Sequence, residues 1–250
     1  KELLKVSYRT LTDEDKKLIR SAFDLALDGH KNQRRKSGEA YIFHPLAVAR
    51  IVAQEIGLDA TSIAAALLHD VVEDNKDISI EDIERLFGKT VAKIVDGLTK
   101  ISSLSKEQDM HASLQAENFR KMLLTLNDDV RVILIKIADR LHNMKTIQFL
   151  SEKKALRVAL ETMEIYAPLA ERLGFENWKS VLENISFKNL HPDIYNRIND
   201  KIDNTFKNLE SSFRDLENII NNFIHKENIN VKIHYRKKAP YSIWKKINKR

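Results

Sequence analysis

The sequence contains no cysteine, which excludes disulfide bonds, thiolate zinc sites and cysteine nucleophiles. It also lacks an apolar run of the roughly 18 residues that a membrane-spanning helix needs, and no secretory signal is visible. A protein without cysteine is compatible with a reducing compartment, so we expect a cytoplasmic protein with no membrane partner. A metal site in this chain must use histidine, aspartate or glutamate.

The formal net charge of +6 has a local origin. Residues 231–250 hold eight of the 42 basic residues and no acidic residue, so the rest of the chain is slightly acidic. This distribution argues against a general nucleic-acid surface, and we expect no direct DNA binding. A local anion site near the C-terminal end is the better interpretation.

Helical periodicity covers most of the chain and predicts a mostly α fold. The expected helices cover residues 12–29, 44–56, 59–74, 79–87, 91–98, 130–147, 153–173 and 193–224. Residues 100–116 are polar and without periodicity, which predicts a mobile loop. The alternation at Val231, Ile233 and Tyr235 predicts a single strand, followed after Pro240 by a helix. We interpret this end as the truncated start of a second, α/β domain.

An adjacent histidine and aspartate interrupt the most apolar helical pattern of the chain. Residues 67–74 read LLHDVVED, so His69 and Asp70 stand where core residues are expected. A buried carboxylate is costly unless it is paired or coordinates a cation. Glu73 and Asp74 follow one helical turn later and share faces with His69 and Asp70. The segment therefore offers metal ligands together with a candidate general base.

Two distant residues complete a candidate metal site with the His69–Asp70 pair. His44 stands at the start of a predicted helix, and Asp139 stands in the apolar helix 130–147. Two imidazoles and two carboxylates suit a divalent ion such as manganese, iron or zinc. Taken alone, His44 is more typical of a helix cap, and Asp139 is more typical of a salt bridge to Arg140 or Lys136.

These residues, in this order, resemble the His-Asp (HD) metal-dependent phosphohydrolases, and within them the hydrolase domain of the RelA/SpoT homologues. The resemblance is carried by four segments, which read HKNQRRKSGEAYIFHP at 30–45, LLHDVVED at 67–74, KIADRLHNMKT at 136–146 and YAPLAERLG at 166–174. Asn32, Ala40 and Lys145 depart from residues common in the family, and none of the three is a proposed ligand.

The resemblance implies an activity and a set of site residues. The implied activity is manganese-dependent hydrolysis of guanosine tetra- and pentaphosphate (ppGpp and pppGpp) to pyrophosphate and GDP or GTP, in the bacterial stringent response. The implied metal ligands are His44, His69, Asp70 and Asp139. Glu73 and Asp74 lie beside the attacking water in this pattern, and the sequence does not say which one is the base. The implied substrate contacts are Arg35, Lys36, Ser37, Asn143 and Thr146.

The C-terminal end carries a second resemblance. Residues 235–246 read YRKKAPYSIWKK and are similar to the opening motif of the family's alarmone synthetase domain. In that motif Arg236, Lys238, Ser242 and Lys246 match positions associated with ATP phosphates. Because the sequence stops before an acidic metal-binding part of a synthetase, we expect this piece of a bifunctional enzyme to be inactive in synthesis. A solvated basic end is the simpler alternative.

The predicted organisation is a hydrolase domain at 1–175, connecting helices at 176–230 and the start of a synthetase domain at 231–250. Association of a full-length protein with the ribosome would use domains outside this sequence. Two alternative functions remain open at this point. One is a nucleotidase of the same metal class with another nucleotide substrate, and the other is a module that senses alarmone without cleaving it.

Overall fold

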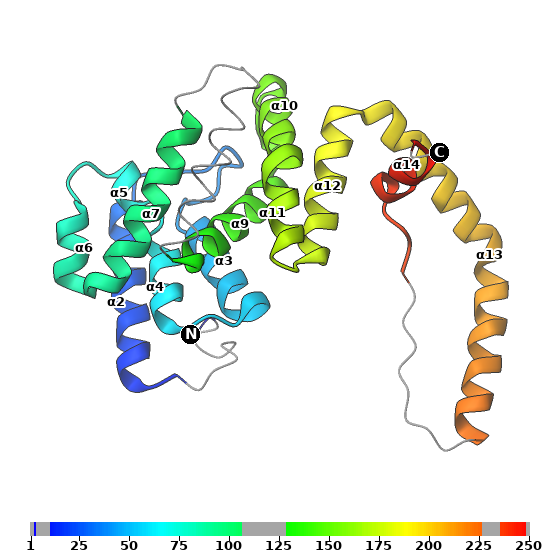
Figure 1. Cartoon of the computed structure of the whole chain (residues 1–250), viewed down its shortest axis with the longest axis horizontal. Coiled ribbons are helices and arrows are strands. Elements are labelled where there is room, and N and C mark those ends of the chain that lie inside the picture. The colour runs from blue at the N-terminus through cyan, green and yellow to red at the C-terminus, as the bar shows by residue number, and fades with distance from the viewer. Residues whose placement is uncertain (1–2, 4–10, 107–128, 227–235, 249–250) are drawn as a thin grey trace. The chain divides into compact units, whose positions relative to one another are not determined.

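The structure, a computed structural model, describes residue 3 and residues 11–106, 129–226 and 236–248. The chain divides into two compact units at residues 151 and 152. Figure 1 labels the helices of both units. The named helices of the first unit are α2 (Asp13–Gly29), α3 (Phe43–Ile51), η1 (Val52–Ile56), α4 (Ala60–Leu68), α5 (Val71–Asp74), α6 (Ile80–Phe87), α7 (Lys89–Lys106), α9 (Val130–Lys145) and η2 (Ile147–Phe149).

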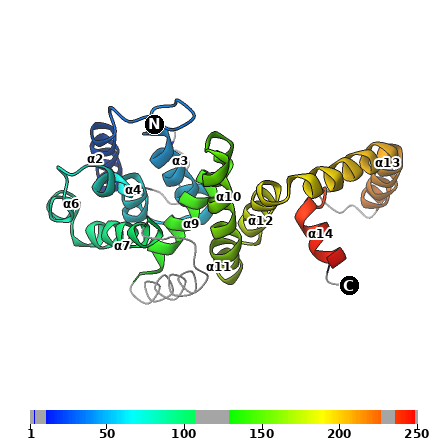
Figure 2. The same ribbon diagram turned by 90° about the horizontal axis from the view of Figure 1, so that it is seen from above.

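Helix α4 forms the centre of the first unit. It contacts α2, α3, α7 and α9, and it lies among them in the views of Figures 1 and 2. Its sequence, ATSIAAALL, is mostly apolar and suits this place, and Leu67 and Leu68 are fully buried. Burial of each leucine contributes about 1.5–3 kcal/mol. The site residues that follow this helix are therefore attached to the buried centre of the unit.

The helix predicted over 59–74 is interrupted at His69 and Asp70. Helix α4 ends at Leu68 and α5 begins at Val71, so His69 and Asp70 occupy the turn between them. Asp70 keeps a near-helical backbone, with φ −105° and ψ −7°, and its carbonyl still accepts from the amide of Asp74 at 2.9 Å. The prediction of one continuous helix was wrong, because periodicity does not show where a local turn aims two side chains inward.

The basic loop before α3 has an ordered, hairpin-like backbone. Arg34 and Ala40 form an isolated antiparallel bridge, which is the only β pairing among the described residues. The amide of Gly38 donates to the carbonyl of Arg35 at 2.9 Å and closes a turn. Gly38 has φ +89°, a left-handed conformation that favours glycine. This turn fixes the direction in which Arg35 leaves the loop.

Helix α7 continues beyond the point where the sequence predicted a mobile loop. It reaches Lys106, so residues 100–106 are helical. Ile101 and Ser102 are buried, and the hydroxyl of Ser102 accepts a hydrogen bond from Lys136 of α9. Contacts across the helix pair thus hold a segment whose sequence has no clear periodicity. Residues 107–116 of the predicted loop lie outside the described residues.

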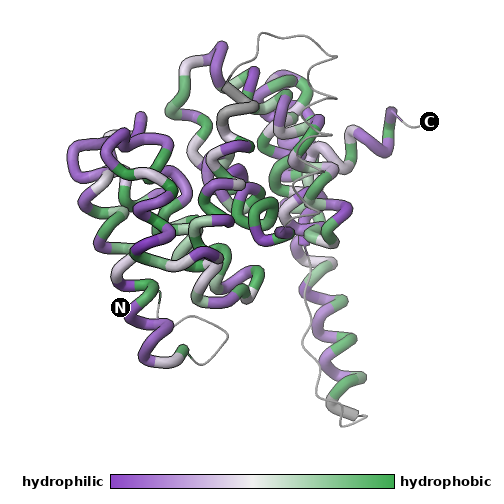
Figure 3. Tube along the Cα trace, turned by 60° about the vertical axis from the view of Figure 1, so that its left-hand side comes forward, coloured by the Kyte–Doolittle hydropathy of each residue, from purple (hydrophilic) through white to green (hydrophobic). Residues whose placement is uncertain are grey.

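The second unit is also helical. Its named helices are α10 (Glu152–Glu161), η3 (Thr162–Tyr166), α11 (Ala167–Arg172), α12 (Glu176–Leu190), α13 (Pro192–Lys226) and α14 (Pro240–Asn248). Helix α12 contacts α10, η3, α11, α13 and α14. Figure 3 shows hydrophilic and hydrophobic segments alternating along α13, and several of its apolar side chains, including Leu216 and Phe223, are exposed.

The mostly α-helical fold that the sequence predicts is confirmed. A helix also follows Pro240 as expected, since proline is suited to the first turn of a helix. The strand predicted at 231–235 lies outside the described residues. The domain boundaries at 175 and 230 stay a prediction. In the part of the chain that the structure describes, no helix has the length and apolar character needed to cross a membrane.

Candidate metal centre

Three elements of the first unit place the four predicted metal ligands. His44 is the second residue of α3, His69 and Asp70 occupy the turn after α4, and Asp139 lies in the middle of α9. His44, His69 and Asp139 are buried, with at most 5% of each residue exposed. Side chains this buried cannot rely on water to compensate their charge, so they must compensate one another or bind a cation.

The four side chains meet. One ligand atom each of His44, His69 and Asp70 lies within 4.8 Å of the other two. Nε2 of His69 lies 3.0 Å from Asp70 Oδ2 and 3.8 Å from Asp139 Oδ1. Nε2 of His44 lies 3.1 Å from Asp139 Oδ1 and 3.6 Å from Asp70 Oδ2. Both imidazoles therefore direct the same nitrogen at both carboxylates.

The two carboxylates remain ionised in this setting. Burial works to raise the pKa of Asp139, but Lys136 and the two histidines outweigh it and hold the pKa well below its usual value. Burial likewise works to raise the pKa of Asp70, but the neighbouring His69 lowers it. A site with two buried carboxylate charges is prepared for a cation.

The two histidines differ in their protonation. Burial works to lower the pKa of His69, but the charges of Asp70 and Asp139 raise it to about 9. Burial dominates at His44 and lowers its pKa, although Asp139 acts in the opposite direction. In the metal-free protein, therefore, His69 carries a positive charge that offsets part of the carboxylate charge.

Hydrogen bonding also suits the site to a divalent cation. Nδ1 of His69 lies 2.8 Å from the carbonyl oxygen of Ala66, which can only accept, so Nδ1 carries a hydrogen. Nε2 of His69 is buried and makes no hydrogen bond of good geometry. Two imidazole nitrogens and two carboxylate oxygens are a suitable donor set for a borderline divalent ion. The residues present therefore fit a metal site.

Tyr41 is a member of the site that sequence reasoning missed. Its hydroxyl donates to Asp70 Oδ2 at 2.7 Å, and its ring packs edge-on to His44 with centroids 5.8 Å apart. Burial, followed by the charge of Asp70, raises the pKa of Tyr41, so the phenol stays protonated and acts as a donor. Its position three residues before His44 is the only signal in the sequence.

Lys136 is a buried lysine beside the candidate metal ligands. Its Nζ lies 3.0 Å from Asp139 Oδ2 and donates to Ser102 Oγ at 2.9 Å. The sequence offered a Lys136 ion pair as an alternative to metal binding by Asp139. The structure shows that the two are compatible, because Oδ2 faces the lysine while Oδ1 faces the histidines.

Three of the predicted substrate contacts join the same site. Nη2 of Arg35 donates to Asn143 Oδ1 at 2.8 Å and to Thr146 Oγ1 at 3.1 Å. Nδ2 of Asn143 in turn donates to Asp139 Oδ1 at 2.6 Å. These hydrogen bonds connect the basic loop to Asp139, a candidate metal ligand, across more than 100 positions of sequence.

The other predicted site residues lie at the edge. Lys36 is exposed, and the hydroxyl of Ser37 donates to Glu39. None of the described contacts joins Lys36 or Ser37 to the four candidate metal ligands. Glu73 is half-buried and Asp74 is exposed, one turn after the His69–Asp70 pair. The charge of Asp74 contributes to the raised pKa of Tyr41, which places it near the site.

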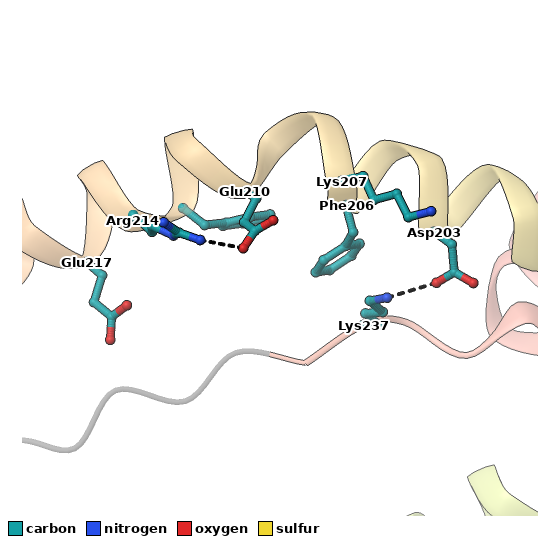
Figure 4. Close-up of a pocket in the computed structure, with 8 residues that line it drawn as sticks. Asp203, Phe206, Lys207, Glu210, Arg214, Glu217 and Lys237 are labelled. Carbon is teal, nitrogen blue, oxygen red and sulfur yellow. Dashed lines mark hydrogen bonds and ion pairs between the residues drawn. The ribbon is translucent and has the colours of Figure 1, made fainter.

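Two cavities of the second unit are separate features. One, of about 520 Å³, lies along α13. Figure 4 shows its lining, where Lys237 pairs with Asp203 at 2.8 Å and Arg214 pairs with Glu210 at 2.6 Å. Its lining holds three acidic and three basic residues, so its formal charges balance, and no predicted site residue lines it.

The second cavity, of about 390 Å³, lies between α12 and the segment that contains α14. The four residues of the predicted synthetase motif, Arg236, Lys238, Ser242 and Lys246, all line it. Lys245 also lines it and pairs with Glu183 of α12 at 3.3 Å. Their role in ATP binding stays a prediction.

Comparison with known proteins identifies the family of the chain. Residues 22–176 match the family model of the HD domain. A guanosine-3′,5′-bis(diphosphate) 3′-pyrophosphohydrolase of Aquifex aeolicus is 44% identical over 93% of this chain and 32% of the relative. The bifunctional (p)ppGpp synthase/hydrolase SpoT of Escherichia coli is 42% identical over 98% of this chain and 35% of the relative. The chain thus spans about a third of the length of these curated relatives.

A solved structure extends the comparison. It is described as a metazoan ortholog of SpoT that hydrolyses ppGpp, and it is 30% identical to this chain with a TM-score of 0.55. The likeness covers 72% of this chain and 97% of that structure. The family predicted from the sequence is therefore confirmed: the chain belongs to the HD-domain family and, within it, to the RelA/SpoT homologues.

Proposed function

We propose that this chain hydrolyses ppGpp and pppGpp at the 3′ position, releasing pyrophosphate and leaving GDP or GTP. The observation that carries the proposal is the buried meeting of His44, His69, Asp70 and Asp139, with Arg35 hydrogen-bonded beside it. Relatives that are named for this reaction, and a solved structure of a ppGpp-hydrolysing protein, support the same substrate.

We propose Mn²⁺ as the ion and the same four side chains as its ligands. When bound, a divalent cation supplies positive charge that offsets the negative charge developing on the phosphoryl oxygens. The chain's own contribution is positional: α3, the turn after α4 and α9 hold the four donors in a buried site. Tyr41 and Asn143 fix the carboxylates of Asp70 and Asp139 by hydrogen bonds.

Further residues are needed to accept the proton of the attacking water and to bind the nucleotide. Glu73 and Asp74 are the candidate bases, because each can take a proton from a water molecule in the site. Arg35 is the main candidate for a phosphate contact, since a guanidinium binds phosphate oxygens through two parallel hydrogen bonds. Asn143 and Thr146 already bind Arg35, so a nucleotide that reaches Arg35 also meets their polar atoms.

The test is release of pyrophosphate from ppGpp with Mn²⁺ and with a chelator. We expect pyrophosphate and GDP in equal amounts with Mn²⁺, and neither with the chelator. Asp139→Asn should abolish release, whereas Asp96→Asn, which removes only a surface partner of Lys100, should not. Full activity of Asp139→Asn would remove Asp139 from the proposed site.

A panel of substrates separates the alternatives. Hydrolysis of nucleoside triphosphates or 2′-phosphorylated dinucleotides in preference to ppGpp would indicate a nucleotidase with another substrate. Tight ppGpp binding without Mn²⁺-dependent turnover would indicate a sensing module.

We further propose that residues 236–246 correspond to the start of a synthetase domain, supported by the shared cavity of the four motif residues. Binding of an ATP analogue that is lost in Arg236→Ala would support this correspondence.

A further inference from the structure

His142 lies directly behind one of the proposed metal ligands. It is on α9, and its Nδ1 lies 2.8 Å from Nδ1 of His44 on α3. The two rings are 4.9 Å apart between centroids and tilted by 37°. Two ring nitrogens at this separation share one hydrogen, which must belong to one ring and be accepted by the other.

The opposite edge of His44 determines which ring donates. Nε2 of His44 faces Asp139 at 3.1 Å and Asp70 at 3.6 Å, on the side of the proposed metal. A nitrogen that binds a metal uses its lone pair and carries no hydrogen. A neutral imidazole has one hydrogen, so in the metal-bound state that hydrogen must be on Nδ1 of His44. His142 must then accept through Nδ1.

His69 shows the same arrangement with a different acceptor. Its Nδ1 lies 2.8 Å from the carbonyl oxygen of Ala66, which leaves Nε2 directed at the carboxylates. Each imidazole of the site therefore has an acceptor behind Nδ1. The acceptor for His69 is main chain and no substitution removes it, whereas the acceptor for His44 is a side chain.

We propose that His142 is a positioning residue that accepts the Nδ1 hydrogen of His44 and so keeps the Nε2 lone pair of His44 available for the metal. The inference deepens the proposed function, on which it rests. The described side-chain hydrogen bond of His142 is to His44, so His142 acts through that ring. Such supporting hydrogen bonds fix both the tautomer and the orientation of a metal-binding ring, and their loss typically lowers metal affinity about 10–100-fold.

Two substitutions in the full chain separate positioning from packing. His142→Leu fills much of the same volume without an acceptor. His142→Asn keeps an oxygen close to the position of Nδ1. We expect the Kd for Mn²⁺, measured by calorimetry, to rise about 10–100-fold in His142→Leu and to return most of the way to the wild-type value in His142→Asn.

A spectroscopic measurement reports the tautomer itself. In the protein loaded with Zn²⁺, which is diamagnetic, the ring nitrogens of His44 can be observed by ¹⁵N NMR and assigned with His44→Gln. We expect a protonated Nδ1 in the wild type and in His142→Asn, and loss of that single protonated form in His142→Leu. A purely structural role would lower the melting temperature and leave the tautomer and the Kd unchanged.

The measurements of Mn²⁺ affinity and of the His44 tautomer do not depend on which nucleotide is the substrate. Unchanged Mn²⁺ affinity and an unchanged His44 tautomer in His142→Leu would overturn the inference, even if the wild type hydrolyses ppGpp. Weaker Mn²⁺ binding that is restored by asparagine would support it, even if ppGpp is not the substrate. The two proposals therefore fail separately.

Discussion

Tyr41 donates a 2.7 Å hydrogen bond to Oδ2 of Asp70, and this bond joins the basic loop to the turn after α4. Tyr41→Phe removes the donor and keeps the ring. A hydrogen bond to a charged group contributes about 1.5–3 kcal/mol. We therefore expect the free energy of unfolding of the metal-free protein to fall by about this amount in urea titrations.

Tyr195→Phe in α13 is the matched control for loss of a phenolic hydroxyl. Its effect on the free energy of unfolding should stay within about 0.5 kcal/mol. If both variants unfold at the same urea concentration as the wild type, the Tyr41–Asp70 hydrogen bond does not stabilise the fold. Mn²⁺ affinity of Tyr41→Phe, measured in parallel, reports whether the bond also orients Asp70.

Lys136→Met tests the buried ion pair with Asp139. Removing one partner of a buried pair leaves an uncompensated charge and costs about 3–5 kcal/mol, so the metal-free variant should melt well below the wild type. A bound cation would then compensate Asp139 without repulsion from the lysine. We expect saturating Mn²⁺ to raise the melting temperature more in Lys136→Met than in the wild type, measured by calorimetry.

Lys100→Met is the control, because it removes an ion pair with Asp96 from a lysine whose side chain is 73% exposed. A pair of this kind contributes about 0.3–0.5 kcal/mol. If the two substitutions destabilise the protein equally, the buried Lys136–Asp139 pair contributes no more to stability than the exposed Lys100–Asp96 pair.

The raised pKa of His69 predicts the pH dependence of metal binding. Because Asp70 and Asp139 raise this pKa to about 9, His69 is protonated in the metal-free protein at neutral pH. A metal ion must displace that proton. The Mn²⁺ affinity should therefore increase by up to about tenfold per pH unit towards pH 9 and level off above it. Calorimetry in buffers of different ionisation enthalpy would detect the released proton.

The same shift predicts how the stability of the metal-free protein varies with pH. The folded pKa of about 9 lies above the ordinary value of 6.5. His69 therefore contributes stability below pH 6.5, and this contribution is lost as the pH rises through 9. Urea unfolding in chelator from pH 6 to 9.5 should show the decline. His69→Gln should flatten it, and an undiminished decline in that variant would assign it to another group.

Arg35→Lys tests the proposed nucleotide contact. Arginine binds Asn143 and Thr146 through one nitrogen and has further donors for phosphate, which a lysine ammonium cannot reproduce in the same geometry. We expect KM for ppGpp to rise about tenfold, equivalent to about 1.4 kcal/mol. Arg34→Lys is the control, since Arg34 donates to the carbonyl of Gly38 within the loop. Equal KM values for the two variants would exclude a special role of Arg35.

The sequence identified candidate site residues where the residue type alone indicates their chemistry. A histidine and an aspartate inside an apolar helix cannot be ordinary core residues, and this reasoning identified His69 and Asp70 before any geometry was known. His44 and Asp139 were added as candidate ligands from their residue types and positions, and the family resemblance implied the same four residues. The structure brings the four side chains together, while their role as ligands stays a prediction.

The sequence could not show in which direction a side chain points or which distant residues it contacts. Tyr41 and His142 reach the site through contacts across 29 and 98 positions of sequence, and neither has a residue type that requires a buried partner. The break between α4 and α5 is invisible in a continuous apolar pattern. Residues 100–106 are helical because Ile101 and Ser102 are buried in the first unit, which no local periodicity indicates.

The side-chain amide of Asn143 makes the two halves of the site interdependent. Its oxygen accepts from Arg35 and its nitrogen donates to Asp139, so turning the amide over would break both bonds. If metal binding shifts Asp139, the position of Arg35 changes through the amide of Asn143. If a phosphate draws Arg35 away, the position of Asp139 changes in the same way. By thermodynamic reciprocity, the factor by which the cation alters nucleotide affinity equals the factor by which the nucleotide alters cation affinity.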